Sequence, residues 1–223
     1  MSLTYTVIFD MDGVLLDTEA IYMEAWQELA KERGLNADDI RNMVLACTGT
    51  TADMTRTIMV ERLGSVEAYE NGLEFTREYF NKYINDNGIP VKKYVRTILD
   101  YLHDKKIKVG LASSTKEAVV RQQMRDTGLY DYFDVILGGD NVVNGKPSPD
   151  IFLDCAKKLN ADPKDCFVIE DSFNGIRAAH AARMHPIMVP DLRRPDDEIK
   201  VIAEAILPDL NEVVKYFDSH III

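Results

Sequence analysis

The sequence predicts a doubly wound α/β fold, in which helices cover both faces of a parallel β-sheet. Five short apolar runs recur along the chain, and each has the continuous hydrophobicity of a strand that is buried on both faces. Amphipathic helical segments lie between these runs, and such strand–helix alternation is typical of this fold class. One long stretch has helical periodicity without an apolar strand, which predicts a helical insert after the first strand.

The first expected strand is Tyr5–Phe9, a β-rich apolar run that ends at Asp10. Residues 18–86 follow with helical spacing of their apolar side chains. Gly34 can end the first helix of this stretch, because glycine tolerates the left-handed conformation common at helix C-termini. The expected helical faces contain Tyr22, Ala25, Trp26 and Leu29, then Met54, Ile58 and Leu63, then Tyr69, Leu73, Tyr79 and Tyr83.

This pattern divides the chain into two expected domains. Residues 1–17 and 87–223 form the α/β core domain, and residues 18–86 form the smaller helical domain. The turn-rich segment Asn85–Pro90 is the expected exit from the insert.

The remainder of the chain alternates between helices and strands. Further strands are expected at Ile107–Ala112, Val135–Leu137, Phe167–Ile169 and Ile187–Val189, and apolar helical faces at 95–102, 119–124, 151–159 and 176–184. Ser148 is an expected N-cap, with Pro149 and Asp150 in the first turn, and Gly128 is an expected helix stop. Ligands of doubly wound sheets bind beyond the carboxyl ends of the strands, so the polar residues at those ends are the first candidates for a site.

The composition narrows the classes of partner. The chain has 223 residues, 46% of them hydrophobic, which is enough apolar surface for a folded core. Its 26 basic and 37 acidic side chains give a net charge of −11. Nucleic acid is not expected as a partner, because phosphate backbones are bound by clustered Lys and Arg. An anionic small substrate would have to be attracted locally, by a metal or a placed lysine.

Cysteine usage and apolar runs predict a cytoplasmic protein. Cys47, Cys155 and Cys166 are odd in number and widely spaced, which argues against a disulfide framework and against a zinc site. The segment Met1–Thr4 has no secretory pattern, and no apolar run approaches the ~20 residues that span a bilayer. We expect no membrane partner, and a monomer, since no long amphipathic seam for a dimer is evident.

The most specific local signal is a pair of carboxylates at the end of the first strand. Asp10 and Asp12 lie two residues apart and are followed by Gly13. Alternate residues of a strand share a face, and two close carboxylates repel, so the pair requires a cation or a shared proton. Glu170 and Asp171 end a later strand. Carboxylates that converge from two strands make an oxygen-rich site suited to Mg²⁺.

Other polar residues at the strand ends suit a bound phosphate. Lys146 precedes a proline-rich loop and could neutralise a nucleophile and a phosphate together. Ser113, Ser114 and Thr115 follow the second strand, where hydroxyl and backbone N–H groups suit phosphate oxygens. The alternative for Ser114 and Thr115 is simple N-capping of the next helix.

Several other hydrolase chemistries are unsupported. No cysteine has an Arg six residues later, as a cysteine-dependent phosphatase requires. The chain lacks the Gly-x-x-x-x-Gly-Lys-Ser/Thr loop of nucleotide triphosphatases. Ser113 also lacks the Gly-x-Ser-x-Gly setting of a nucleophile elbow.

These residues resemble the haloacid dehalogenase superfamily over nearly the whole chain. The segment Asp10–Val14, with Asp17 and Thr18 beyond it, is similar to the first motif of the family. Ser113, Lys146 and the pair Glu170-Asp171 match the second, third and fourth motifs in order. The insert looks like the family's small helical cap. The subgroup it resembles most is that of β-phosphoglucomutase-like proteins and sugar-phosphate phosphatases.

The resemblance implies a Rossmann-like core with strand order 5-4-1-2-3 and a role for each motif residue. Asp10 would attack phosphorus and carry an aspartyl-phosphate, and Asp12 would be the general acid/base. The phosphate oxygens would be held by Ser113 and Lys146. Mg²⁺ would be held by Asp10, the backbone carbonyl of Asp12 and Asp171, with Glu170 supporting its waters. True dehalogenases of the family lack the second aspartate and the metal, so the residues present favour phosphoryl transfer.

The acceptor of the phosphoryl group decides between two activities. Water makes a phosphatase, and a sugar hydroxyl makes a mutase. The mutases of the family carry a His on the first cap helix and an Arg after the second, whereas this chain has Tyr22 and an Arg-free segment Cys47–Asp53, with Arg56 only beyond it. We therefore expect a Mg²⁺-dependent phosphatase acting on a small phosphorylated metabolite such as a sugar phosphate. A hexose-phosphate mutase is the alternative, and a non-catalytic binding module is a remote one.

Overall fold

The computed structural model describes residues 5–47 and 52–220. The expected features of Met1–Thr4, and most of the Cys47–Asp53 segment, therefore lie outside the described residues. The chain divides into two compact units, one formed by Met1–Leu16 with Val91–Ile223 and the other by Asp17–Pro90.

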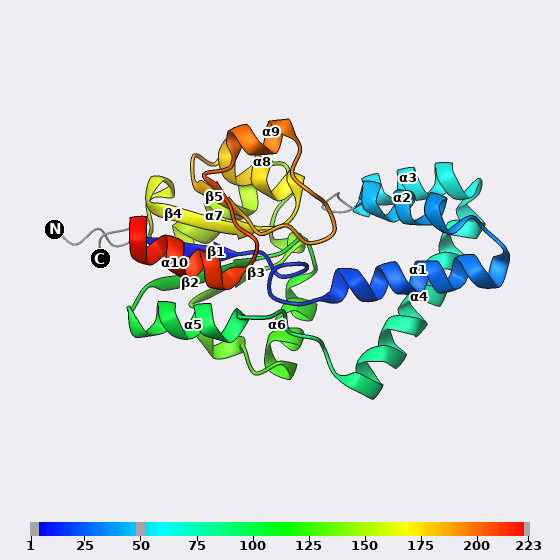
Figure 1. Ribbon diagram of the computed structural model, residues 1–223, viewed down its shortest axis with the longest axis horizontal. Helices are drawn as coiled ribbons and strands as arrows, with labels where there is room; N and C mark the ends of the chain where they lie inside the picture. Colours follow the sequence, from blue (N-terminus) through cyan, green and yellow to red (C-terminus); the bar gives the residue numbers. More distant parts are fainter. Residues whose placement is uncertain (1–4, 48–51, 221–223) are drawn as a thin grey trace. The chain divides into compact units, whose positions relative to one another are not determined.

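The first unit has a doubly wound α/β architecture, as the sequence predicts. Its described residues form a six-stranded sheet of parallel neighbours in the order β3-β2-β1-β4-β5-β6 (Figure 1). This contains the expected order 5-4-1-2-3 and adds an edge strand. The strands are β1 (Thr6–Phe9), β2 (Lys108–Ala112), β3 (Val135–Leu137), β4 (Cys166–Glu170), β5 (His185–Met188) and β6 (Ala205–Ile206).

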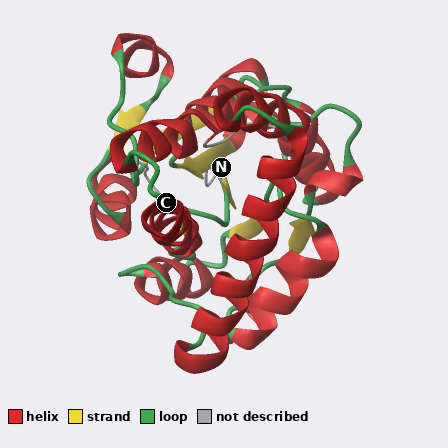
Figure 2. Ribbon diagram, turned by 90° about the vertical axis from the view of Figure 1, so that its right-hand side faces the viewer, coloured by secondary structure: helices red, strands yellow, loops and turns green. Residues whose placement is uncertain are grey.

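Helices cover both faces of this sheet (Figure 2). Ile8 and Val168 belong to the buried cluster that also contains apolar residues of α7 (Asp150–Lys158) and α8 (Phe173–Ala181). Phe167 must face the opposite side, because successive residues of a strand point to opposite faces, and it packs against Phe217 of α10 (Leu210–His220). The helices are α5 (Val95–Asp104), α6 (Glu117–Asp126), α7 (Asp150–Lys158), α8 (Phe173–Ala181), α9 (Asp197–Ile202) and α10 (Leu210–His220), with 3₁₀ turns η1 (Tyr130–Tyr132), η2 (Gly139–Asn141) and η3 (Pro163–Asp165).

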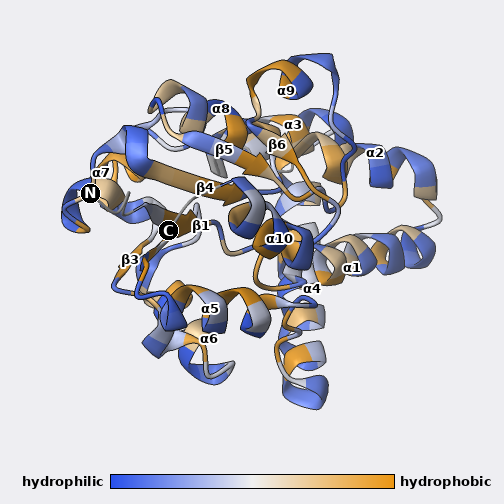
Figure 3. Ribbon diagram, turned by 60° about the vertical axis from the view of Figure 1, so that its left-hand side comes forward, coloured by the Kyte–Doolittle hydropathy of each residue, from blue (hydrophilic) through white to orange (hydrophobic). Residues whose placement is uncertain are grey.

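The burial of the central strands explains their continuous hydrophobicity. All four residues of β1 and all five of β4 are buried, and both strands are coloured as hydrophobic in Figure 3. The register places Phe9 of β1 opposite Leu111 of β2 and Ile169 of β4. Consequently the residues that follow these strands meet at one edge of the sheet.

Two local expectations were wrong at helix ends. The N-cap of α7 is Pro149, and Ser148 instead donates from its hydroxyl to Asp150 at 2.7 Å. Helix α8 ends at Ala181, three residues before Met184. The Met184 N–H still bonds to Ala179 and its side chain is buried, so its apolar spacing reflects core packing just beyond the helix.

The second unit consists of helices, as the insert pattern predicts. They are α1 (Thr18–Arg33), α2 (Ala37–Cys47), α3 (Ala52–Leu63) and α4 (Val66–Asn87). Gly34 has φ +63° and ends α1 as expected. The expected exit turn begins later than Asn85, because α4 continues to Asn87 and the Gly88 N–H bonds to Ile84. None of the helices in the described part of the chain combines the length and hydropathy of a membrane crossing.

Candidate active site

The turn after β1 directs two acidic side chains to the carboxyl edge of the sheet. Asp10 is anchored by its N–H, which donates to the Ile169 carbonyl at 3.0 Å. Gly13 has φ +81°, and a Cβ atom there would lie 2.4 Å from the Asp171 carboxylate. Only glycine satisfies both the left-handed backbone and the close approach. This explains why a glycine follows the two aspartates.

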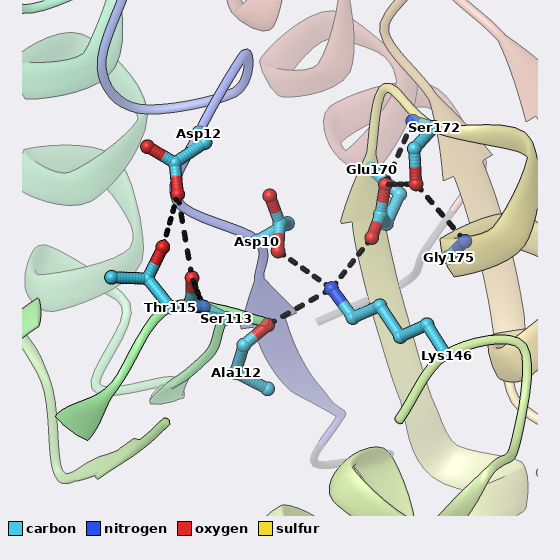
Figure 4. Close-up of polar contacts among 9 residues, drawn as sticks. All are labelled: Asp10, Asp12, Ala112, Ser113, Thr115, Lys146, Glu170, Ser172 and Gly175. Carbon is cyan, nitrogen blue, oxygen red and sulfur yellow. Dashed lines mark hydrogen bonds and ion pairs between the residues drawn. The ribbon is translucent and has the colours of Figure 1, made fainter. Parts of the chain in front are cut away.

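Lys146 lies at the centre of the site. Its side chain is only 3% exposed, and its ammonium donates to Asp10 at 2.6 Å, to Glu170 at 2.7 Å and to the Ala112 carbonyl at 3.1 Å (Figure 4). An ammonium has three N–H donors, so these contacts use all of them. Burial by itself would lower the pKa of Lys146, but the two carboxylates outweigh it and raise that pKa. The lysine is therefore a fixed positive charge.

Glu170 is held by the segment that starts α8. Its second carboxylate oxygen accepts from the Ser172 N–H at 2.8 Å and from the Ser172 hydroxyl at 2.9 Å. The same hydroxyl accepts the Gly175 N–H at 3.0 Å and so caps the helix. A Cβ atom on Gly175 would lie 1.7 Å from Glu170, so the carboxylate occupies the space that a side chain would fill.

Three buried carboxylates gather beside one ammonium. Carboxylate oxygens of Asp10, Glu170 and Asp171 lie within 4.8 Å of one another. When all three are ionised, Lys146 leaves two negative charges uncompensated. Burial raises the pKa of Asp10 well above its ordinary value. Lys146 opposes this shift, whereas the negative charges of Glu170 and Asp12 add to it. An all-oxygen donor set with excess negative charge fits a hard divalent cation such as Mg²⁺.

The Asp12 side chain takes a different direction from that of Asp10. Its carboxylate oxygen Oδ2 accepts the Thr115 hydroxyl at 3.0 Å and the Ser113 hydroxyl at 3.5 Å (Figure 4). The Ser113 oxygen also accepts the Thr115 N–H at 3.0 Å. The structure thus joins Asp12 to the loop after β2.

The loop after β2 is packed against the loop after β3. A Cβ atom on Gly139 would lie 2.3 Å from the Ser114 carbonyl oxygen, which explains the glycine there. The N-cap of α6 is Lys116, and the first helical N–H, that of Glu117, is bonded by Asp140 at 2.7 Å. Neither Ser114 nor Thr115 is therefore the N-cap. Ser114 has an exposed side chain, whereas Ser113 is buried.

The structure brings most of the predicted site residues into one place. Five of them are buried at the carboxyl edge of the sheet, namely Asp10, Ser113, Lys146, Glu170 and Asp171. Asp12 is half-buried beside them. Sequence reasoning missed Thr115 as a partner of Asp12 and Ser172 as a partner of Glu170. The available signals were the position of Thr115 two residues after Ser113 and that of Ser172 directly after the acidic pair.

The chain is similar to several known proteins. Residues 7–189 match the family described as haloacid dehalogenase-like hydrolase. The chain is 35% identical over 186 residues to a phosphorylated carbohydrates phosphatase of Thermotoga maritima, covering 81% of this chain and 82% of that protein. It is 32% identical over 183 residues to a fructose-1-phosphate phosphatase of Escherichia coli, covering 82% and 95%. A crystal structure of β-phosphoglucomutase from Clostridium difficile is similar with a TM-score of 0.76 at 27% identity, covering 98% and 96%.

Proposed function

The chain belongs to the haloacid dehalogenase-like hydrolase family, and we propose that it hydrolyses a small phosphomonoester, a sugar phosphate, through a phosphorylated Asp10. The observation that carries this proposal is the arrangement around Lys146, whose ammonium lies 2.6 Å from the Asp10 carboxylate in a buried site. A carboxylate is a weak nucleophile towards a phosphate dianion because both are negative. A fixed ammonium beside the attacking oxygen reduces that repulsion.

In the first step, an Asp10 oxygen forms a bond to phosphorus while the bond from phosphorus to the ester oxygen breaks. Asp12 gives its proton to the departing alcohol oxygen, and such acid catalysis contributes roughly 10²–10⁴-fold. The Ser113 hydroxyl donates to a phosphate oxygen, and Lys146 donates to another once the phosphate takes the place of one of its three present acceptors. The negative charge of these oxygens is spread over the equatorial positions in the transition state. The covalent intermediate divides one difficult displacement into two easier ones.

In the second step, water attacks the phosphorus and the bond to Asp10 breaks. Asp12 now takes the proton from the water, so it returns to the protonated form in which the cycle began. The products are the alcohol, inorganic phosphate and the unmodified Asp10 carboxylate.

The residues of the acidic cluster would hold Mg²⁺. Asp10, Asp171 and the backbone carbonyl of Asp12 would be its protein ligands, and Glu170, which Lys146 and Ser172 hold in place, would orient its waters. When bound, the ion supplies charge compensation for the phosphate. Ser114, which is exposed, would contact a phosphate oxygen only at the rim of the site.

The substrate class is supported by the named relatives. Two of them act on phosphorylated carbohydrates and on fructose 1-phosphate. The alternative is a hexose-phosphate mutase, which the likeness to β-phosphoglucomutase favours. Tyr22 counts against the mutase, since it occupies the position where a His is expected, and its ring stacks on Phe80 at 4.8 Å.

A screen of sugar phosphates tests the proposal, with free phosphate and isomer formation followed in the same reactions. We expect phosphate release without isomerisation. Isomerisation of β-glucose 1-phosphate, primed by a bisphosphate, would show that the chain is a mutase and not a phosphatase. A chain that turns over no phosphomonoester in the presence of Mg²⁺ would contradict both activities.

A further inference from the structure

We propose that Thr115 is a positioning residue for Asp12, holding the carboxylate that transfers the proton in both chemical steps. This inference rests on the proposed function, because it assigns a task within the same reaction. The Thr115 hydroxyl donates to Oδ2 of Asp12 at 3.0 Å, whereas the Ser113 hydroxyl is 3.5 Å from the same atom. Hydrogen bonds between oxygens weaken beyond about 3.0 Å, so Thr115 is the stronger of these two donors.

Thr115 is itself fixed on both sides of its backbone. Its N–H donates to the Ser113 oxygen at 3.0 Å, and its carbonyl accepts the Gly139 N–H at 2.8 Å. The second bond ties the loop after β2 to the loop after β3, which pack so closely that a Cβ on Gly139 would clash. The hydroxyl therefore starts from a rigid support, as a group that orients another side chain must.

The proposed reaction separates the tasks of the two hydroxyls. Ser113 is buried next to the Lys146 cluster, and when its hydroxyl donates to a phosphate oxygen its long contact with Asp12 is given up. Of these two hydroxyls, that of Thr115 keeps its bond to Asp12 while substrate is bound. The bond from the Thr115 hydroxyl to Oδ2 fixes the plane of the Asp12 carboxylate, and with it the place of the other oxygen, Oδ1. Rotation of the carboxylate would displace that oxygen and lower the rate of proton transfer.

The test compares Thr115→Val, which keeps the branched shape and removes the donor, with Thr115→Ser, which keeps the hydroxyl. For an alkyl phosphate such as a sugar phosphate, we expect Thr115→Val to lower kcat by about tenfold with KM within twofold of the wild type. Thr115→Ser should recover most of that loss. Thr127→Val is the matched control, because the Thr127 hydroxyl donates to the Gln123 and Met124 carbonyls of α6.

Rapid mixing with p-nitrophenyl phosphate separates the two steps. Its leaving group departs as a stable anion without acid assistance, so Thr115→Val should release a burst of about one nitrophenolate per site at the wild-type rate. Slow turnover should follow, because the second step still needs Asp12 as a base. The melting temperature of each variant, measured alongside, shows whether the fold is retained.

Four outcomes would overturn the inference. A raised KM with unchanged kcat would mean that Thr115 binds the substrate phosphate instead. A burst slowed as much as turnover would place its effect on Asp10, and wild-type rates in Thr115→Val would show that the contact has no role. A crystal structure of Thr115→Val with an unmoved Asp12 carboxylate would contradict the positioning role independently of activity. A wild type without phosphatase activity would instead contradict the proposed function.

Discussion

At the scale of single residues, the site depends on charges that cannot be removed without exposing others. Lys146 stands between Asp10 and Glu170, each within 2.7 Å of its ammonium. Truncation of one member of such a buried group leaves a partner unpaired, which typically costs about 3–5 kcal/mol. Mild, isosteric substitutions are therefore the informative ones for this site.

Asp10→Asn is the isosteric change at the proposed nucleophile. An amide lacks the negative oxygen that attacks phosphorus, so we expect turnover to fall below detection while the fold is retained. Phosphate release measures the activity. Mg²⁺ titration followed by thermal melting measures the remaining metal binding, which should survive in part through Asp171 and the backbone carbonyl of Asp12. Substantial turnover in this variant would rule out Asp10 as the nucleophile.

Gly13→Ala separates backbone strain from a steric clash. Gly13 and Gly34 both have positive φ, but only at Gly13 would a Cβ meet another group, the Asp171 carboxylate at 2.4 Å. Gly13→Ala and Gly34→Ala should each cost roughly 1–2 kcal/mol of folding free energy, because each places a side chain on a left-handed backbone. Only Gly13→Ala should also reduce activity and raise the Mg²⁺ concentration needed. Urea unfolding and a Mg²⁺ titration measure the two effects, and equal activities in the two variants would show that the Asp171 contact does not matter.

At the scale of elements, Arg121 links α6 to the edge of the sheet. It donates to Glu117 at 2.6 Å within the helix, to the Tyr130 hydroxyl at 3.0 Å and to the Ile136 carbonyl on β3 at 3.3 Å. Strand β3 has only three residues and lies at the sheet edge. Arg121 therefore supports a short strand that its pairing with β2 alone would hold weakly.

The Arg121 contact predicts a pH dependence of stability. The hydrogen bond from Arg121 holds the pKa of Glu117 below its ordinary value. A depressed pKa stabilises the fold above the unfolded-state pKa, about 4.3, and this contribution disappears as the pH falls through the folded value. Because both side chains are partly exposed, Arg121→Met should cost only about 1 kcal/mol at pH near 7, with a smaller difference from wild type near pH 3. Urea unfolding at both pH values checks this, and a constant difference would mean that the ion pair contributes nothing.

The helical unit relies on a close approach between two elements. A Cβ on Gly72 of α4 would lie 2.5 Å from the Trp26 ring of α1. The buried indole therefore packs directly on the backbone of α4. A glycine in the middle of a helix is unfavourable by roughly 1 kcal/mol relative to alanine, and at this position the packing of Trp26 compensates for it.

At the scale of the whole molecule, the net charge of −11 should repel a phosphorylated substrate. Part of that charge is the site itself, where three buried carboxylates outnumber one ammonium. We expect EDTA to abolish activity and Mg²⁺ to restore it, and Mg²⁺ to raise the melting temperature because it binds the folded protein. Phosphate release and thermal melting provide the two readouts. Full activity in excess EDTA would contradict the metal role of the cluster.

The parallel sheet and the helical insert could be predicted from the sequence alone, and so could the residues that we propose for the site. Buried strands such as Val7–Phe9 are continuous apolar runs, and their pattern is local, so it is readable without a structure. The two-residue strand β6 was missed because its pattern is too short to stand out. The carboxylates of Asp10 and Asp171 were predicted because strand ends gather at one edge of a parallel sheet.

How these residues bond to one another could not be predicted, because their contacts form only in the folded chain. Lys146 is 136 positions from Asp10 in sequence, and Thr115 is 103 positions from Asp12. Their contacts depend on the register of β1 against its neighbours and on the paths of the loops, which glycines such as Gly139 make possible. Hydrophobic periodicity carries no information about those paths, since a side-chain hydrogen bond requires ångström-scale placement that only the packed fold provides.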